Sequence, residues 1–128
     1  MNTQRNPVAW FEIYVQNMER AKAFYEKTLG QDLEQLSDPN DGGIVMWAFP
    51  MVQDGGGAAG ALVKMDGKDS GGGGTIVYFS CADCGPTSKA ALDAGGKMQL
   101  EKMPIGEYGF ISLVYDTEGN LIGLHSME

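Results

Sequence analysis

The feature that most constrains the fold of this chain is an internal repeat that relates its two halves. Shifting the first half by 66 residues places Val15 on Cys81, Asn17 on Asp83 and Gly30 on Gly96. The same shift places the apolar run IVMWAF on FISLVY. Both halves show one order of predicted elements, a strand, a helix and three further strands. Internal repetition of this kind indicates a repeated architecture.

The repeat predicts an α+β fold in a single domain over residues 1–128, built from tandem βαβββ units at about 7–64 and 75–126. One unit alone has no partner with which to bury a face of its sheet. Two units are therefore expected to form a larger curved mixed sheet with the helices on its outer face. The curvature is expected to leave a concave cavity on the inner face.

The first strand is the clearest of the predicted strands. The stretch VAWFEIYV at 8–15 is rich in aromatic and β-branched residues, which favour strands. Strand alternation places Trp10, Glu12 and Tyr14 on one face and a wholly apolar set on the other. The apolar face is expected to meet a helix, which leaves the aromatic face and its carboxylate for the inner side.

The two helices follow the first strand of each half. Apolar residues at spacings of three and four predict a helix over 18–29, with Asn17 as its N-cap and Gly30 just past its end. Asp83 is the expected N-cap of the second helix. The remaining strands are expected near 32–36 and over 43–50, 57–65, 75–82, 97–101, 109–116 and 120–127.

The charge of the chain limits its partners. The net charge is −8, from 17 acidic and 9 basic residues, so phosphate backbones would be repelled and no nucleic acid partner is expected. An acidic surface serves solubility or forms a groove for a cationic ligand. The polar start MNTQRNPV and the absence of a long apolar run predict no signal peptide, no membrane partner and a cytoplasmic location.

Two motifs give the chain a family resemblance. The helix ERAKAFYEKTLG and the closing stretch D-x-E-G-N-x-I-G-L, set within two βαβββ units, resemble the vicinal oxygen chelate superfamily over about residues 7–126. This superfamily includes glyoxalases (lactoylglutathione lyases), extradiol dioxygenases and bleomycin-resistance proteins. The resemblance implies a homodimer with the cavity near or across its interface. It also implies a divalent metal held by His and Glu side chains on the first and last strands of each unit.

The positions of those metal ligands hold no donors in this chain. The resemblance places them at Trp10, at Ile76, at Gly123 and at either Gly60 or Ala61. A metal needs imidazole, carboxylate or thiolate ligands, and none of these residues supplies one. No metal or other cofactor is therefore expected, and the metal-dependent chemistry of glyoxalases is not predicted.

Glu12 and His125 are the candidate catalytic residues. Each lies two positions beyond an expected metal-ligand position, on the inner face of its strand. If the two lie close together, they would form a general acid/base pair. The alternative is a solvated Glu12 and a partly exposed His125 at a strand end. A metal held by these two residues alone would lack the third protein ligand usual for catalytic zinc.

Further residues are candidates for ligand binding. Trp10, Tyr14, Trp47 and Tyr78 could line an apolar pocket, or they could simply pack in the core. The loop MPIGEYGF at 103–110 holds two more candidates, Glu107 and Tyr108. The resemblance places this loop near the cavity mouth. Its glycines permit the movement of a lid and equally permit an ordinary turn.

The two cysteines, Cys81 and Cys84, are spaced as C-x-x-C at the start of the second helix. Alternation and the repeat bury Cys81 with Val77 and Phe79, while Cys84 follows the N-cap Asp83. A zinc site would need two more ligands, and a disulfide is not expected in a reducing cytosol. The sequence therefore indicates a structural role for the pair.

Three functions remain open from the sequence. The first is a glyoxalase/bleomycin-resistance-like protein that binds a small molecule in the concave cavity without the usual metal. The second is an enzyme, a lyase or isomerase of the lactoylglutathione-lyase type that uses Glu12 and His125, with or without a bound divalent metal. The third is a structural or regulatory dimer without a small ligand.

Overall fold

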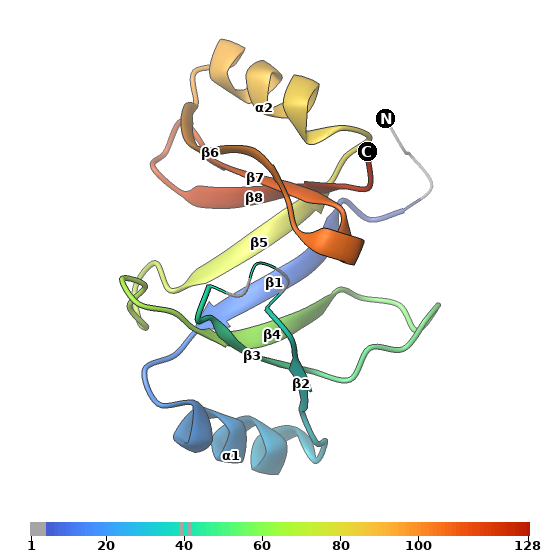
Figure 1. Ribbon diagram of the computed structural model, residues 1–128, viewed down its shortest axis with the longest axis vertical. Coiled ribbons are helices and arrows are strands. Elements are labelled where there is room, and N and C mark those ends of the chain that lie inside the picture. Colours follow the sequence, from blue (N-terminus) through green and yellow to red (C-terminus); the bar gives the residue numbers. More distant parts are fainter. Residues whose placement is uncertain (1–4, 39, 41) are drawn as a thin grey trace. The chain divides into compact units, whose positions relative to one another are not determined.

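The computed structural model describes residues 5–38, 40 and 42–128 (Figure 1). The described residues fold as two compact units, residues 10–75 and residues 5–9 with 76–128, which we call the first and the second unit. The second boundary falls just after Thr75, which follows a glycine-rich stretch. Residues 5–9, with the start of the first strand, belong to the second unit.

The first unit contains one helix and one sheet. Its elements are β1 (Val8–Tyr14), α1 (Met18–Leu29), β2 (Glu34–Leu36), β3 (Val45–Ala48) and β4 (Ala59–Lys64). The strands lie in the order β2-β3-β4-β1. β1 and β4 are parallel, whereas β3 is antiparallel to both of its neighbours. The crossover between the parallel strands carries α1, as a parallel pair requires.

The second unit repeats this plan. Its elements are β5 (Thr75–Ser80), α2 (Cys84–Asp93), β6 (Lys97–Pro104), the short 3-10 helix η1 (Gly106–Tyr108), β7 (Phe110–Tyr115) and β8 (Leu121–Ser126). The strand order is β5-β8-β7-β6, with β5 and β8 parallel and the other pairs antiparallel. The α+β class and the βαβββ order of both halves are confirmed.

The helix boundaries follow the predicted caps. The Asn17 side chain accepts a hydrogen bond from the Arg20 amide, and Gly30 adopts a left-handed conformation with φ 67°. Asp83 caps α2 by accepting from the Gly85 amide. The repeat departs at the end of α2, where Gly95 rather than Gly96 has a positive φ. Among the described residues, no helix is long and apolar enough to cross a membrane.

The core of the first unit lies between α1 and one face of its sheet. The strand register places Ile13 beside Leu62, and Leu62 is fully buried. The cluster around it contains Val15, Met18 and Leu33. The apolar face of β1 therefore meets α1 as the alternation predicts, and the Trp10, Glu12 and Tyr14 face is turned away from the helix.

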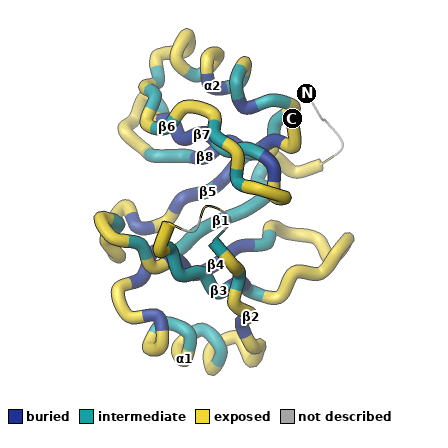
Figure 2. The backbone as a smooth tube through the Cα atoms, in the orientation of Figure 1, coloured by how far each residue is buried: buried dark blue, intermediate teal, exposed yellow. Residues whose placement is uncertain are grey.

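The core of the second unit lies beneath α2, which contacts β6, β7 and β8. Its most buried side chains include Val114, Cys84, Ser112 and Ser126, none more than 2% exposed. Figure 2 shows the buried strands of each unit and the exposed outer surfaces of both helices. This core is unusual in holding two hydroxyls and a thiol, so its polar atoms need partners.

Candidate functional site

A carboxylate with two aromatic donors occupies the helix-free face of the first unit's sheet. The Tyr14 hydroxyl donates to Glu12 Oε1 at 2.7 Å, and the Trp10 indole Nε1 donates to Glu12 Oε2 at 3.2 Å. We call these three residues the Glu12 triad. Each carboxylate oxygen has a donor from the same strand, so the carboxylate is held in one orientation.

Tyr14 is the buried member of this triad and stays in its protonated form. It is only 7% exposed. Burial raises the pKa of Tyr14 far above its ordinary value, and the charge of Glu12 and the hydrogen bond to Glu12 raise it further. Tyr14 therefore stays protonated at physiological pH and serves Glu12 as a permanent donor.

Small and apolar residues of β4 flank the triad. The parallel register pairs Trp10 with Ala59, Glu12 with Ala61 and Tyr14 with Val63. The face thus combines aromatic rings, short aliphatic side chains and one oriented carboxylate. Small-molecule sites have this composition, a mostly apolar lining with a few placed polar groups.

Trp47 lies on the opposite face of the same sheet. Its register partner is Leu62, which belongs to the core beneath α1. The Lys22 ammonium stands over the Trp47 ring, 3.5 Å from its centroid. The structure therefore separates Trp47 from Trp10 and Tyr14, because successive strand residues point to opposite faces. The prediction that Trp47 shares an inner pocket with them does not agree with this placement.

Tyr78 covers the last expected ligand position in the second unit. Tyr78 pairs with Gly123 across β5 and β8, and it is 5% exposed. A Cβ added at Gly123 would collide with the Tyr78 ring. The ring therefore fills the space that a ligating side chain at position 123 would need, and Tyr78 packs as a core residue on this face.

His125 lies two residues further along β8 and contacts the loop before β7. Its Nε2 lies 2.6 Å from the Tyr108 carbonyl oxygen. A carbonyl only accepts, so Nε2 carries the proton and donates, and Nδ1 is left as the basic nitrogen. The Tyr108 and Glu107 side chains are exposed in η1. The loop thus meets His125 through its backbone rather than through its two candidate side chains.

Glu12 and His125 belong to different compact units. Glu12 is oriented by Trp10 and Tyr14 within the first unit, and His125 by the Tyr108 carbonyl within the second. Each candidate catalytic residue therefore has a defined setting of its own. Their action as an acid/base pair stays a prediction.

The family's metal does not fit the residues at its expected positions. A Cβ added at Gly60 would collide with Phe11 on the helix side, so Ala61, beside Glu12, is the counterpart on the triad face. Ala61, Trp10, Ile76 and Gly123 offer no metal donor. Within the described ranges, no group of three His, Cys, Asp or Glu side chains could hold a metal ion.

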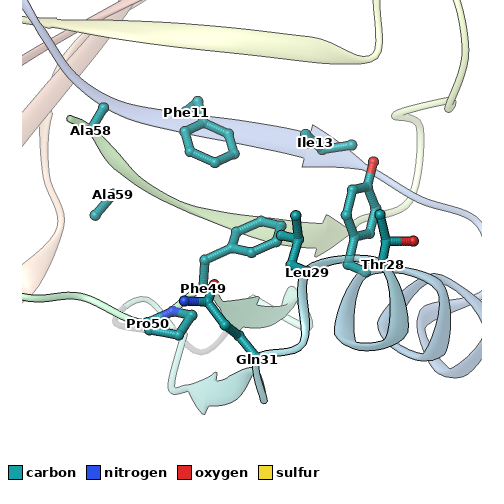
Figure 3. Close-up of a pocket in the computed structure, with 10 residues that line it drawn as sticks. Phe11, Ile13, Thr28, Leu29, Gln31, Phe49, Pro50, Ala58 and Ala59 are labelled. Carbon is teal, nitrogen blue, oxygen red and sulfur yellow. The ribbon is translucent and has the colours of Figure 1, made fainter.

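A separate hollow lies on the helix side of the first unit, and sequence reasoning missed it (Figure 3). Its volume is about 390 Å³. Phe11 and Phe49 stack with their ring centroids 5.6 Å apart, and Tyr25 meets Phe49 edge-on at 5.5 Å. The hollow is mostly apolar, with Thr28 and Gln31 at its wall. The sequence feature closest to this hollow is the apolar face of β1. From the sequence, this face is predicted only to pack against a helix.

Comparison with known proteins gives the family. Residues 8–124 match the model of the Glyoxalase/Bleomycin resistance protein/Dioxygenase superfamily. The chain belongs to this superfamily. The family resemblance predicted from the helix and the closing motif is therefore confirmed. A search of curated protein sequences finds no match.

Solved structures share the superfamily fold at low sequence identity. Methylmalonyl-CoA epimerase from Mycobacterium tuberculosis is 17% identical with a TM-score of 0.70, covering 100% of this chain and 93% of that chain. A variant of Streptomyces coelicolor methylmalonyl-CoA epimerase, in complex with 2-nitronate-propionyl-CoA, is 16% identical with a TM-score of 0.69, covering 96% and 98%. A hypothetical protein from Bacillus halodurans is 13% identical with a TM-score of 0.71, covering 94% of each chain. These similarities establish the fold of this glyoxalase-superfamily chain. The ligand has to be inferred from the residues of this chain itself.

Proposed function

We propose that this glyoxalase-superfamily protein binds a small molecule on the triad face of the first unit, without the usual divalent metal. The observation that carries the proposal is the Glu12 carboxylate, held by the Trp10 indole and the Tyr14 hydroxyl at 3.2 and 2.7 Å. A carboxylate oriented in this way among aromatic rings selects a ligand by hydrogen bonding and by shape. The family's metal-ligand positions supply no donor, which supports recognition by side chains instead.

Charge favours a cationic or neutral ligand. The chain carries a net charge of −8, and Glu12 adds a negative charge at the proposed site. An acyl-CoA of the kind bound by the Streptomyces epimerase carries several phosphate charges, which such a chain repels. Methylmalonyl-CoA is therefore a useful negative probe, and amines with an attached ring are the preferred positive probes.

The second candidate is a lyase or isomerase that uses Glu12 and His125. The observation that favours it is the 2.6 Å contact between His125 Nε2 and the Tyr108 carbonyl, which fixes the tautomer. With Nε2 donating to this carbonyl, Nδ1 is the ring nitrogen left to accept a proton from a substrate. Turnover would require that both residues act on one substrate.

The test combines metal analysis, ligand binding and activity on the purified protein. We expect no stoichiometric metal, and no turnover of the hemithioacetal of methylglyoxal and glutathione with added Ni²⁺, Zn²⁺, Mg²⁺ or Mn²⁺. We expect thermal shifts from a library of ring-bearing amines, and weaker binding of each hit by Glu12→Gln. The matched control is Glu19→Gln on the first turn of α1. Stoichiometric metal with turnover would overturn the metal-free proposal.

The alternative is tested with the same preparations. An active protein should lose turnover in both Glu12→Gln and His125→Ala if the two residues form the acid/base pair. Activity that survives both substitutions would exclude the pair. Methylmalonyl-CoA is included among the substrates because epimerases share the fold.

We also propose that the protein is a homodimer in the cytoplasm. Several large apolar side chains of the first unit are exposed, Phe24, Leu29, Met51 and Val52, at 60%, 51%, 54% and 74%. Exposed large apolar side chains are candidates for burial in an interface between two copies of the chain. Light scattering coupled to size-exclusion chromatography measures the state directly, and a monomer at micromolar concentration would contradict the proposal.

A further inference from the structure

The two thiols of the C-x-x-C sequence lie over one short segment of β8. Cys81 Sγ is 3.5 Å from the His125 carbonyl oxygen, and Cys84 Sγ is 3.4 Å from the carbonyl oxygen of the preceding residue, Leu124. Both cysteines are free thiols. A side-chain hydrogen bond between Cys81 and Cys84 brings the two sulfurs together at the start of α2.

The two cysteines differ in exposure. Cys84 is the fully buried thiol, at 0% exposure, whereas Cys81 is half-buried. The predicted burial of Cys81 is only partial, whereas Val15, its counterpart in the repeat, lies at the same place after β1 and is buried. Cys81 is therefore partly exposed, while Cys84 is kept from solvent.

Cys84 is surrounded by groups that suit a resolving thiol. It is the first residue of α2, where the helix dipole favours negative charge. The Ser126 hydroxyl lies 3.2 Å from Cys84 Sγ and can donate to the sulfur as its proton leaves. The Ser126 oxygen also accepts from the Cys84 amide at 3.0 Å. These contacts hold the buried sulfur in place beside the half-exposed one.

We propose that Cys81 and Cys84 form a reversible redox pair, in which peroxide oxidises Cys81 and Cys84 closes an intrachain disulfide. The small-molecule proposal does not require this pair. An experiment that contradicts one of the two proposals therefore leaves the other unaffected. The structural role predicted from the sequence describes the reduced state only. The site is a modification site at the junction of β5 and α2.

The chemistry balances with hydrogen peroxide as the oxidant. The Cys81 thiol first gives its proton to water, the thiolate attacks one peroxide oxygen and the O–O bond breaks, and the leaving hydroxide takes up that proton to form water. Cys81 is then a sulfenic acid. The Cys84 sulfur attacks the Cys81 sulfur, the S–O bond breaks, and hydroxide leaves with the Cys84 proton as a second water. The two sulfurs are each oxidised by one electron, and the peroxide is reduced.

The first step is slow near neutral pH in the reduced protein. Burial raises the pKa of the Cys81 thiol, and the neighbouring Cys84 raises it further by charge and hydrogen bonding, against a lowering by a hydrogen bond with Thr87. A raised pKa lowers the thiolate fraction at a given pH. The oxidation rate should therefore rise with pH through and above the ordinary thiol range.

Disulfide formation would alter β8. The Cys81 thiol is one of two donors to the His125 carbonyl, the other being the Cys81 amide at 2.9 Å. The disulfide has no S–H and removes the first donor. Because His125 lies at this point of β8, the pair offers a route by which oxidation shifts a candidate functional residue.

The test is mass spectrometry of the full chain after treatment with hydrogen peroxide. Both cysteines fall in one tryptic peptide, residues 69–89, so an intrachain disulfide appears as the loss of two hydrogens from that peptide. We expect this loss with no alkylation by iodoacetamide, and full recovery of two alkylated thiols after dithiothreitol. A peptide with Cys81 oxidised to sulfinic acid and Cys84 still reduced would overturn the proposal.

Two variants separate the roles of the thiols. Cys84→Ala should leave Cys81 as a sulfenic acid that dimedone traps, because no resolving thiol remains. Cys81→Ser should leave Cys84 reduced in peroxide, since its sulfur is buried, and it tests the order even if Cys84→Ala fails to fold. Peroxide oxidation of Cys84 in the Cys81→Ser protein would contradict the assignment of Cys81 as the attacking thiol.

Discussion

The surroundings of Tyr14 differ strongly from those of a solvent-exposed tyrosine. Its side chain is buried, and its hydroxyl donates a hydrogen bond to Glu12 Oε1 at 2.7 Å. A phenol in this setting costs free energy when it ionises, because the phenolate would be both desolvated and repelled by Glu12. Its position also fixes the carboxylate on which the proposed ligand site depends.

The raised pKa of Tyr14 predicts a loss of stability at high pH. The unfolded chain releases the Tyr14 proton above the ordinary value of 10.0, whereas the folded protein holds it. The free energy of unfolding should therefore fall as pH rises above this value, and less so in Tyr14→Phe. Urea unfolding across this pH range measures the difference between the two proteins. Equal pH dependence in both would show that Tyr14 does not carry the effect.

Ser112 is a second residue whose surroundings lead to a prediction. Its side chain is 0% exposed, and among the described residues its hydroxyl has no hydrogen-bond partner. Removing an unpaired buried polar group relieves its desolvation cost. Ser112→Ala should therefore be neutral or stabilise the protein by up to about 1 kcal/mol. Chemical denaturation provides the measurement. The control is Ser126→Ala, which removes a bonded hydroxyl and should destabilise the protein.

β5 and β8 approach closely because β8 carries a glycine opposite Tyr78. The Tyr78 ring lies over Gly123, and this packing buries Tyr78 to 5% exposure. A closing strand with any larger residue at this position would push the ring away. The element that holds a metal ligand in relatives is thus used here for close packing of an aromatic ring.

Gly123→Ala should destabilise the protein by about 1–3 kcal/mol through overpacking against Tyr78. Gly72→Ala is the matched control, because a Cβ there meets no atom within 4 Å. Thermal and urea unfolding of the two variants give the comparison. The smaller side chain of Tyr78→Leu should remove most of the cost in a double variant, and an unchanged cost would locate the strain elsewhere.

At the scale of the whole molecule, the segment 65–74 connects β4, the last strand of the first half, to β5, the first strand of the second half. This segment forms successive turns rather than a strand or helix, and most of its residues are exposed. Glycines at 71 and 73 adopt positive φ values of 90° and 81°, which suit glycine and strain other residues. The connection between β4 and β5 therefore contains no helix or strand.

Limited proteolysis should begin in this connection. Lys68 lies in a turn, whereas the lysines and arginines of α1, α2 and β6 lie in regular structure. Brief trypsin treatment should cut at Lys68 before these sites, apart from the N-terminal Arg5. Mass spectrometry of the early fragments identifies the first cut. Early cleavage within either helix would contradict the order of stability implied by the fold.

The sequence by itself determined the repeat, the α+β class, the family and the two helix starts. Each of these depends on local patterns that can be read from the order of residues alone. These patterns are the alternation in β1, the spacing of three and four in α1, and the caps Asn17 and Asp83. The missing metal donors were also visible, because ligand chemistry depends on residue type at a known position. The orientation of Trp10, Glu12 and Tyr14 to one side followed from alternation alone.

Only the tertiary structure decided which side chains meet. Trp47 turned out to pack under Lys22 because the register of β3 against β4 puts it with Leu62, and a register shifted by one residue would reverse its face. The exposures of Cys81 and Cys84 depended on how the start of α2 packs against β7 and β8, where Cys84 meets the Phe110 and Leu124 carbonyl oxygens. Tyr78 over Gly123, and the Tyr108 carbonyl on His125, are contacts between residues distant in sequence. Such contacts depend on the packing of whole elements, and no local pattern encodes them.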